Sequence, residues 1–266
     1  MITKIANWNV NGGAALPWHD NKTIRKETVD IIMDEKADVF VITEFALAYG
    51  WDYLEERMKA NGYVWFSSFV SGRNGILILV KENIIKDTKE LANSLWKKEE
   101  TIHSYNDIDM NMLMVTFETS NGKRCTVCGL RMLMPVGNVK DNNCKPCYDA
   151  MRMVLDKEIL PMAEKLYLEN DIVIFVGDFN NAAYREDYSG FDQINYNWHI
   201  LKKAFESIGY EMLDVNNNGG PINTKKSNPI DHIFARGFDK EKCGVLTFDR
   251  YSDHRILYAH VKESEI

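Results

Sequence analysis

The chain has 266 residues, of which 45% are hydrophobic and 11% aromatic, enough for a substantial buried core. Its net charge of −7, with no dense basic stretch, disfavours nucleic-acid binding without excluding it, because a bound divalent cation inverts the field of an acidic site. No basic leader or long apolar run is visible, so we expect a cytoplasmic protein without membrane association. We also expect the protein to be a monomer.

Strand-like and helix-like segments alternate along the chain. Apolar runs rich in β-branched residues predict a first strand from Lys4 and further strands at 37–43, 63–69, 75–81, 111–118, 124–132, 172–176, 229–235 and 255–261. Apolar residues at helical spacing predict helices at about 22–35, 51–61, 148–169 and 197–208, the third kinked near Pro161. Asn121-Gly122 predicts a hairpin turn. No repeat or linker interrupts this order, so we expect residues 1–266 to form a single domain.

A polar group follows the buried strand 172–176, in Gly177-Asp178-Phe179-Asn180. Asp178 and Asn180 are two residues apart, so at a strand end they point toward the same side of the sheet. A carboxylate and a carboxamide placed in this way can orient a water, hold a metal ion or contact a phosphate oxygen. The alternative is a plain turn, since Gly, Asp and Asn are common turn formers.

Other strand-like runs also stop at polar residues, at Asn9, Glu44 and Asp231 and near Ser252-Asp253-His254. In order along residues 3–261, these endings and the group around Asp178 resemble the endonuclease/exonuclease/phosphatase superfamily, which includes deoxyribonuclease I-like and exonuclease III-like nucleases. The resemblance implies an α/β fold, a four-layer α/β sandwich of two packed mixed β-sheets flanked by helices. It also implies a site where strand ends of both sheets meet.

The same resemblance implies a metal site. Glu44 matches the metal-binding glutamate, Asn9 the asparagine that supports the metal, and Asp253 an aspartate beside it. Hard oxygen ligands of this kind suit Mg²⁺, with Mn²⁺ as a substitute. Asn7 and Asn11 are candidates for supporting positions. Asn11 stands where some relatives carry an aspartate, which removes one charged ligand and weakens the case for a second metal ion.

The catalytic residues that the resemblance implies are Asp178, Asn180, Asp231 and His254. In this interpretation Asp178 orients or activates a water and Asn180 contacts a phosphate oxygen. Asp231 hydrogen-bonds one nitrogen of His254, and His254 helps to stabilise the developing charge. Whether His254 acts as an acid, a base or a charged donor is left open by the sequence.

One position departs from the family pattern. The strand 124–132 usually ends in a histidine or tyrosine that contacts the phosphate, and here Arg131 is the best-placed candidate. A guanidinium can bind a phosphate through two hydrogen bonds but does not readily transfer a proton. The alternative is that Arg131 is a surface residue and that the loop has shifted.

The cysteine spacing fits a zinc ribbon, because Cys125-x-x-Cys128 is followed by Cys144-x-x-Cys147. We predict that these cysteines do not bind zinc, since Cys125 and Cys128 lie within a strand and residues three apart on a strand point to opposite faces. Cys144 and Cys147 could form a redox pair or a local disulfide, but in a cytosolic protein we expect reduced thiols.

The function predicted from these motifs is a Mg²⁺-dependent nuclease that hydrolyses phosphodiester bonds of DNA or RNA. One alternative is a phosphatase or phosphodiesterase acting on a small phosphorylated metabolite, an inositol phosphate or a lipid headgroup, which the negative charge favours mildly. Another is a catalytically weak binding module. The departures at Asn11 and Arg131 support that alternative, and the rest of the matched set argues against it.

Overall fold

The structure is a computed structural model. It describes residues 1–10, 25–45, 50–68, 75–87, 95–97, 110–132, 153–180, 198–216, 220, 222–224, 229–248 and 251–264. Asn11, Cys144 and Cys147 lie outside these residues.

In the described part of the chain the strands form two mixed sheets. Across the first sheet the order is β11 (Phe238–Leu246), β12 (Ile256–Glu263), β1 (Lys4–Asn9), β2 (Val39–Phe45), β4 (Gly75–Lys81) and β3 (Tyr63–Ser67). Across the second sheet it is β5 (Leu95–Lys97), β6 (Met110–Glu118), β7 (Arg124–Met132), β8 (Ile172–Asp178), β10 (Asp231–Arg236) and β9 (Glu211–Met212). In each sheet the central pair is parallel, β1 with β2 and β7 with β8, while the flanking pairs are antiparallel.

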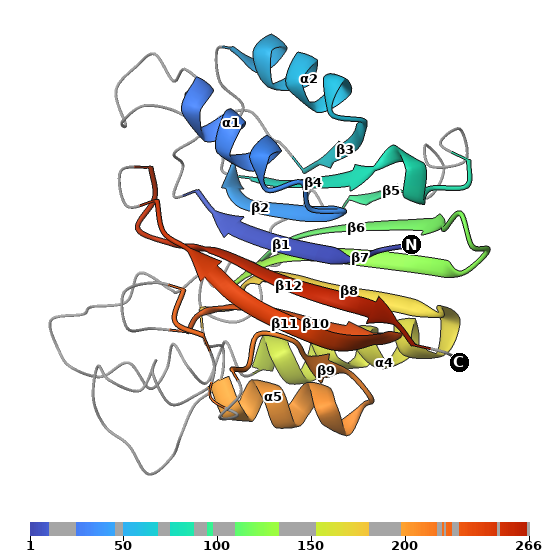
Figure 1. The fold of residues 1–266 in the computed structure, drawn as a ribbon. Helices are drawn as coiled ribbons and strands as arrows, with labels where there is room; N and C mark the ends of the chain where they lie inside the picture. The colour runs from blue at the N-terminus through green and yellow to red at the C-terminus, as the bar shows by residue number, and fades with distance from the viewer. Residues whose placement is uncertain are drawn as a thin grey trace, which may run out of the picture.

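Helices cover the outer face of each sheet (Figure 1). The helices α1 (Lys26–Asp34) and α2 (Trp51–Ala60) pack on the first sheet, and α4 (Leu160–Glu169) and α5 (Trp198–Ser207) on the second. Buried apolar side chains of both sheets, such as Val41 and Ile174, meet between them in a third cluster. The result is the predicted four-layer α/β sandwich. No helix among the described residues is long and apolar enough to cross a lipid bilayer.

Most predicted elements are present, with ends shifted by a few residues. A π-helical turn (Leu155–Ile159) precedes α4 and Pro161, where a kink was predicted. A short 3₁₀ turn (Glu82–Ile84) follows β4. The hairpin between β6 and β7 closes at Gly122, whose φ is 79° and whose N–H donates to Thr119 O at 2.8 Å.

The strand β11 is the main element that the sequence did not predict. Its residues include charged and half-buried side chains, because it lies at the edge of the first sheet and pairs with β12 alone in the described structure. Charged residues are common on edge strands, where they hinder pairing with other chains. The apolar run that signals a central strand is therefore missing from its sequence.

The two cysteines of β7 point to opposite faces, as predicted. Cys125 lies in the core between the sheets, and Cys128 lies in the core between the second sheet and its helices. Both are buried free thiols whose pKa burial raises. These two thiols therefore cannot bind one zinc ion.

The two sheets are in close contact at Gly129 of β7. A Cβ atom at this position would lie 2.8 Å from Ile76 Cγ2, 3.0 Å from Val41 Cγ1 and 3.3 Å from Ile78 Cδ1. All three neighbours belong to the core between the sheets and are fully buried. A side chain at residue 129 would thus push the sheets apart.

We predict that Gly129→Ala lowers the free energy of unfolding by about 1–3 kcal/mol, because added methyl groups strain a close-packed core. Gly220→Ala is the matched control, since its Cβ would lie 3.6 Å from Asn216 Nδ2, an ordinary van der Waals distance. Urea denaturation of both variants measures the difference. Equal stability of Gly129→Ala and wild type would show that the sheets are not in contact at this position.

Candidate active site

The ends of the two parallel strand pairs bring four of the predicted site residues together. Asn9 ends β1, Glu44 is near the end of β2, Arg131 is near the end of β7, and Asp178 ends β8. Arg131 and Asp178 are partners in the register of the parallel pair β7 and β8. Carboxyl ends of parallel strands lie at one edge of a sheet, and here that edge is shared by both sheets.

The side chain of Asn9 joins the two sheets at this edge. Its Nδ2 donates to Glu44 Oε1 at 2.9 Å in its own sheet and to Asp178 Oδ2 at 2.8 Å in the other sheet. Asn9 is fully buried, so these carboxylates are held by a group that water does not reach. The amide sets the spacing of the two acids.

A bulge in β2 directs the side chain of Glu44. The pairing with β4 shifts between Ile42 and Phe45, and Glu44 within this interval has a φ of 54°. A non-glycine residue with positive φ is strained, and such strain occurs often at functional sites. Bulges commonly re-aim one side chain. Ile42 and Phe45 are fully buried, whereas Glu44 stays partly exposed.

The end of β8 has a second unusual backbone. Gly177 has a φ of 151°, and a Cβ there would lie 1.8 Å from the carbonyl oxygen of Leu130 on β7, so no other residue fits without a backbone shift. Asn180 has a φ of 44°, which asparagine tolerates. The backbone N–H of Asn180 donates to Asp178 Oδ1 at 2.9 Å, and its side-chain Nδ2 donates to Met132 O. The turn therefore fixes both the acid and the carboxamide.

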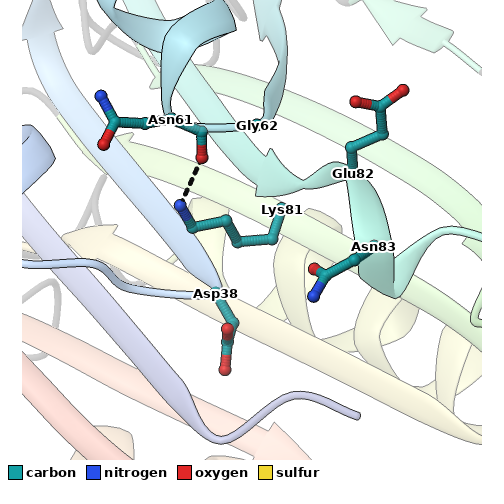
Figure 2. A pocket seen from close by; sticks show the side chains of 6 residues that line it. All are labelled: Asp38, Asn61, Gly62, Lys81, Glu82 and Asn83. Carbon is teal, nitrogen blue, oxygen red and sulfur yellow. Dashed lines mark hydrogen bonds between the residues drawn. The ribbon is translucent and has the colours of Figure 1, made fainter.

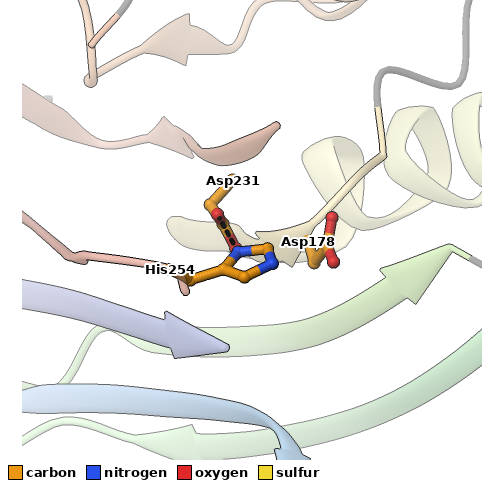
Figure 3. Close-up of side chains that lie close together, drawn as sticks. All are labelled: Asp178, Asp231 and His254. Atoms are coloured by element: carbon orange, nitrogen blue, oxygen red, sulfur yellow. Dashed lines mark hydrogen bonds and ion pairs between the residues drawn. The ribbon is translucent and has the colours of Figure 1, made fainter. Parts of the chain in front are cut away.

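Asp231 and His254 form a buried pair beside Asp178 (Figure 3). His254 Nδ1 lies 2.8 Å from Asp231 Oδ2, and Asn7 Nδ2 donates to the other oxygen of Asp231 at 3.2 Å. Burial raises the pKa of Asp231, but the charge and hydrogen bond of His254 outweigh it and leave that pKa below its ordinary value. Asp231 thus stays ionised and orients the imidazole, whose Nε2 faces away from it.

The pKa of Asp178 is shifted in the opposite direction, above its ordinary value. Burial and then the charge of Asp231 raise the pKa of Asp178 from 3.8 to about 6, although His254, the Asn180 N–H and Arg131 oppose the shift. One ligand atom each from Asp178, Asp231 and His254 lies within 4.8 Å of the others, a spacing that could hold a metal ion. Within this cluster Asp231 Oδ2 and His254 Nδ1 are already hydrogen-bonded to each other, which leaves fewer atoms to bind an ion.

The side chain of Arg131 is largely buried rather than at the surface, and the loop that follows β7 lies outside the described residues. The arginine side chain is 16% exposed and pairs with Glu44, with Nη2 at 2.7 Å and Nε at 3.0 Å from Oε1. The other oxygen of Glu44, Oε2, receives no hydrogen bond from the described residues. A partly exposed carboxylate with one open oxygen fits a hard cation such as Mg²⁺.

Asp253 and His232 are the two remaining residues named by the motifs. Asp253 Oδ1 lies 3.9 Å from His254 Nε2, and 38% of its side chain is exposed. His232 follows Asp231 on β10 but pairs with the buried Asp214, with 2.7 Å between Nδ1 and Oδ2. His232 is therefore part of a separate buried pair.

Three supporting residues were not predicted. Ser252 Oγ donates to the backbone oxygen of Asn9 at 2.6 Å and accepts from the His254 N–H at 3.0 Å. Thr224 Oγ1 accepts from the Asp231 N–H at 3.1 Å, and Trp8 Nε1 donates to His254 O at 3.1 Å. Ser252 stands within the Ser-Asp-His motif, which was its only signal. The contacts of Thr224 and Trp8 bridge distant parts of the chain and leave no pattern in the sequence.

A separate hollow lies at the opposite end of the first sheet (Figure 2). It is lined by Asp38, Asn61, Gly62, Lys81, Glu82 and Asn83. Lys81 Nζ donates to Asn61 O at 2.6 Å, and Asp38 Oδ2 accepts from the N–H groups of Thr3 and Lys4. Because Lys81 and Asp38 already bind backbone groups of the protein, the hollow provides no set of groups comparable with those at the site.

Solved structures share this fold at low sequence identity. An endonuclease/exonuclease/phosphatase from Beutenbergia cavernae aligns with a TM-score of 0.61 and 16% identity, covering 98% of this chain and 71% of its own. The 3′ phosphatase NExo from Neisseria, bound to product DNA hairpin, gives 0.60 and 16% with coverage of 98% and 99%. Truncated Caenorhabditis elegans TDP2 gives 0.58 and 12%, with 97% of both chains covered.

No curated protein sequence matches the chain significantly. The sequence profile of the Endonuclease/Exonuclease/phosphatase family, however, matches residues 6–254. This match runs from the middle of β1 to His254 and so includes every described site residue. The chain therefore belongs to the endonuclease/exonuclease/phosphatase family.

Proposed function

We propose that this phosphoesterase depends on Mg²⁺, with Mn²⁺ as a substitute, and hydrolyses phosphodiester bonds of DNA or RNA. The observation that carries the proposal is the buried contact of Asp178 with Asn9, which places Asp178 beside both Glu44 and the pair Asp231 and His254. An acid, an oriented imidazole and a candidate cation ligand then face one space. This is the set of groups that water attack on a phosphate requires.

Asp178 orients the attacking water in this mechanism and accepts its proton. Its raised pKa makes the carboxylate a stronger base than an exposed aspartate, while at neutral pH it remains mostly ionised. Its two oxygens accept from Asn9 Nδ2 and the Asn180 N–H, so the carboxylate cannot rotate freely. The water is therefore held in one direction.

His254 stabilises the charge that develops on the phosphate, using Nε2. Its other nitrogen is fixed by Asp231, so the ring orientation is set before substrate binds. Nδ2 of Asn180 carries two N–H bonds, of which one donates to Met132 O and the other is directed to the phosphate. Arg131 contributes a guanidinium. Both groups donate hydrogen bonds to phosphate oxygens in this proposal.

Glu44, Asn9 and Asp253 are the residues that would hold the divalent ion. A bound ion supplies a positive charge that polarises a phosphate oxygen and favours departure of the leaving group. The family is metal-dependent, and the open oxygen of Glu44 supports a location at this carboxylate.

Nucleic acid is the substrate class that the neighbouring structures favour. NExo was solved with a product DNA hairpin, and D. rerio TDP2 with a single-strand DNA product at a TM-score of 0.55 and 15% identity. A small phosphorylated metabolite remains the second candidate, because the net charge of −7 opposes long-range attraction of a polyanion.

The first prediction of this proposal is that purified protein hydrolyses single-stranded or duplex DNA or RNA only with Mg²⁺ or Mn²⁺. Glu44→Gln and His254→Ala should each lower the rate at least about a hundredfold, since each removes a charge-stabilising group. His260→Ala, on β12 outside the site, is the control for the histidine and should hydrolyse at the wild-type rate. Melting temperatures are measured beside the rates.

Three outcomes separate the alternatives. Phosphate release from a panel of phosphorylated metabolites, without hydrolysis of nucleic acids, would support the phosphatase alternative. No hydrolysis of any substrate would favour the alternative that the protein is a catalytically weak binding module. Full activity of Glu44→Gln and His254→Ala would contradict the site.

The second prediction concerns the pH dependence of stability without metal. Because the pKa of Asp178 is raised on folding, the folded state holds this proton more tightly, and its contribution to stability falls as pH rises from about 4 through about 6. Asparagine cannot ionise. The stability of Asp178→Asn relative to wild type should therefore increase by up to about 3 kcal/mol from pH 4 to pH 7.

Urea denaturation in EDTA at several pH values measures this difference. The test uses the change with pH, so a constant loss from altered hydrogen bonds to Asn9 or Asn180 does not obscure it. A difference that stays flat with pH would mean that Asp178 has an ordinary pKa.

A further inference from the structure

The ion pair of Arg131 with Glu44 has an unequal geometry. Arg131 Nη2 and Nε lie 2.7 Å and 3.0 Å from the same oxygen, Oε1, and Asn9 Nδ2 donates to that oxygen at 2.9 Å. A two-pronged arginine–carboxylate pair would engage both oxygens. Here Oε2 is left without a hydrogen bond from the described residues. The side chains are 14% and 16% exposed, so solvent ions can reach them.

In this arrangement the guanidinium supplies the positive charge that Glu44 needs. Bringing a divalent ion to Oε2 would place it close to the guanidinium, and like charges at a partly buried site repel strongly. The ion therefore weakens the hold of Arg131 on Glu44. A neutral side chain at residue 131 would leave Glu44 uncompensated and more attractive to a cation.

The released guanidinium would stay beside the catalytic acid. Arg131 is the register partner of Asp178, and the Asn180 carboxamide is anchored on the carbonyl of Met132, the next residue of the same strand. The charge of Arg131 already acts on Asp178, whose pKa it lowers against the effect of burial. Rotation about the arginine side chain is enough to move its donors from Glu44 toward a phosphate bound over Asp178 and Asn180.

We propose that Arg131 is a charge-exchange residue. It neutralises Glu44 in the metal-free protein, gives up this carboxylate to the divalent ion, and then donates to the substrate phosphate. Metal and phosphate thus strengthen each other's binding by the same factor, as linkage requires. The inference rests on the proposed metal site at Glu44. It goes beyond that site by coupling the two ligands through one side chain.

The first experiment measures Mn²⁺ binding without substrate, by isothermal titration calorimetry. Arg131→Gln should bind Mn²⁺ about three- to tenfold more tightly than wild type, because its carboxylate no longer has an internal cation. Arg124→Gln is the matched control, since Arg124 lies at the other end of β7 and donates to Asn170. Its affinity should equal that of wild type.

The second experiment adds inorganic phosphate as the probe, with and without Mg²⁺. In wild type, saturating Mg²⁺ should tighten phosphate binding. In Arg131→Gln, Mg²⁺ should increase the phosphate affinity less, because only the direct attraction between the ion and the phosphate remains. Arg131→Lys keeps the charge with a single ammonium and should fall between the two. Arg131→Lys also replaces Arg131→Gln as the test variant if Arg131→Gln has a lowered melting temperature.

The outcomes distinguish this inference from the proposed function. If wild type hydrolyses substrate with Mg²⁺ but Arg131→Gln and Arg131→Lys bind Mn²⁺ no more tightly, the exchange is overturned while the function stands. If Glu44→Gln binds Mn²⁺ like wild type, the metal site itself is wrong and the inference fails with it. Tighter binding by Arg131→Gln, unchanged binding by Arg124→Gln and loss of the phosphate gain support the exchange.

Discussion

The carboxamide of Asn9 holds together two acids that come from different sheets. Its single nitrogen donates to Glu44 and to Asp178, so the relative position of β2 and β8 at this edge is set by one fully buried side chain. The two sheets also pack tightly at Gly129, where a Cβ would lie 2.8 Å from Ile76 and 3.0 Å from Val41 of the first sheet. Packing between the sheets is thus the condition for the chemistry at their edge.

The site also concentrates features that reduce stability. Glu44 and Asn180 have positive φ, Gly177 leaves no room for a side chain, and Asp178 is buried with a raised pKa. Each costs folding free energy, and each fixes the direction of a functional group. The pair Asp231 and His254 is better compensated, because Asn7 donates to the Asp231 carboxylate and Thr224 accepts from the Asp231 N–H. Arg131 compensates the charge of Glu44 in the same way, and a divalent cation at Glu44 would take over this compensation.

The sequence predicted the fold better than it predicted the contacts within the candidate site. Apolar strand runs ending in Asn9, Glu44 and Asp178 were sufficient to predict that these strands exist, because a buried strand of a mixed sheet has a strong local signal. The edge strand β11 has no such signal and was missed. The ion pair of Arg131 with Glu44 joins residues 87 positions apart on different sheets, and only the packing of those sheets brings them together. The same holds for Asn7 and Asp231, 224 positions apart.

The central claim is that water held by Asp178 attacks the phosphorus of a nucleic acid. The most direct measurement is hydrolysis of an oligonucleotide substrate with Mg²⁺ in water enriched in heavy oxygen, followed by mass spectrometry of both products. The account predicts one heavy oxygen atom in the phosphate product and none in the hydroxyl product. Heavy oxygen in the hydroxyl product, or unlabelled phosphate from an elimination, would contradict it.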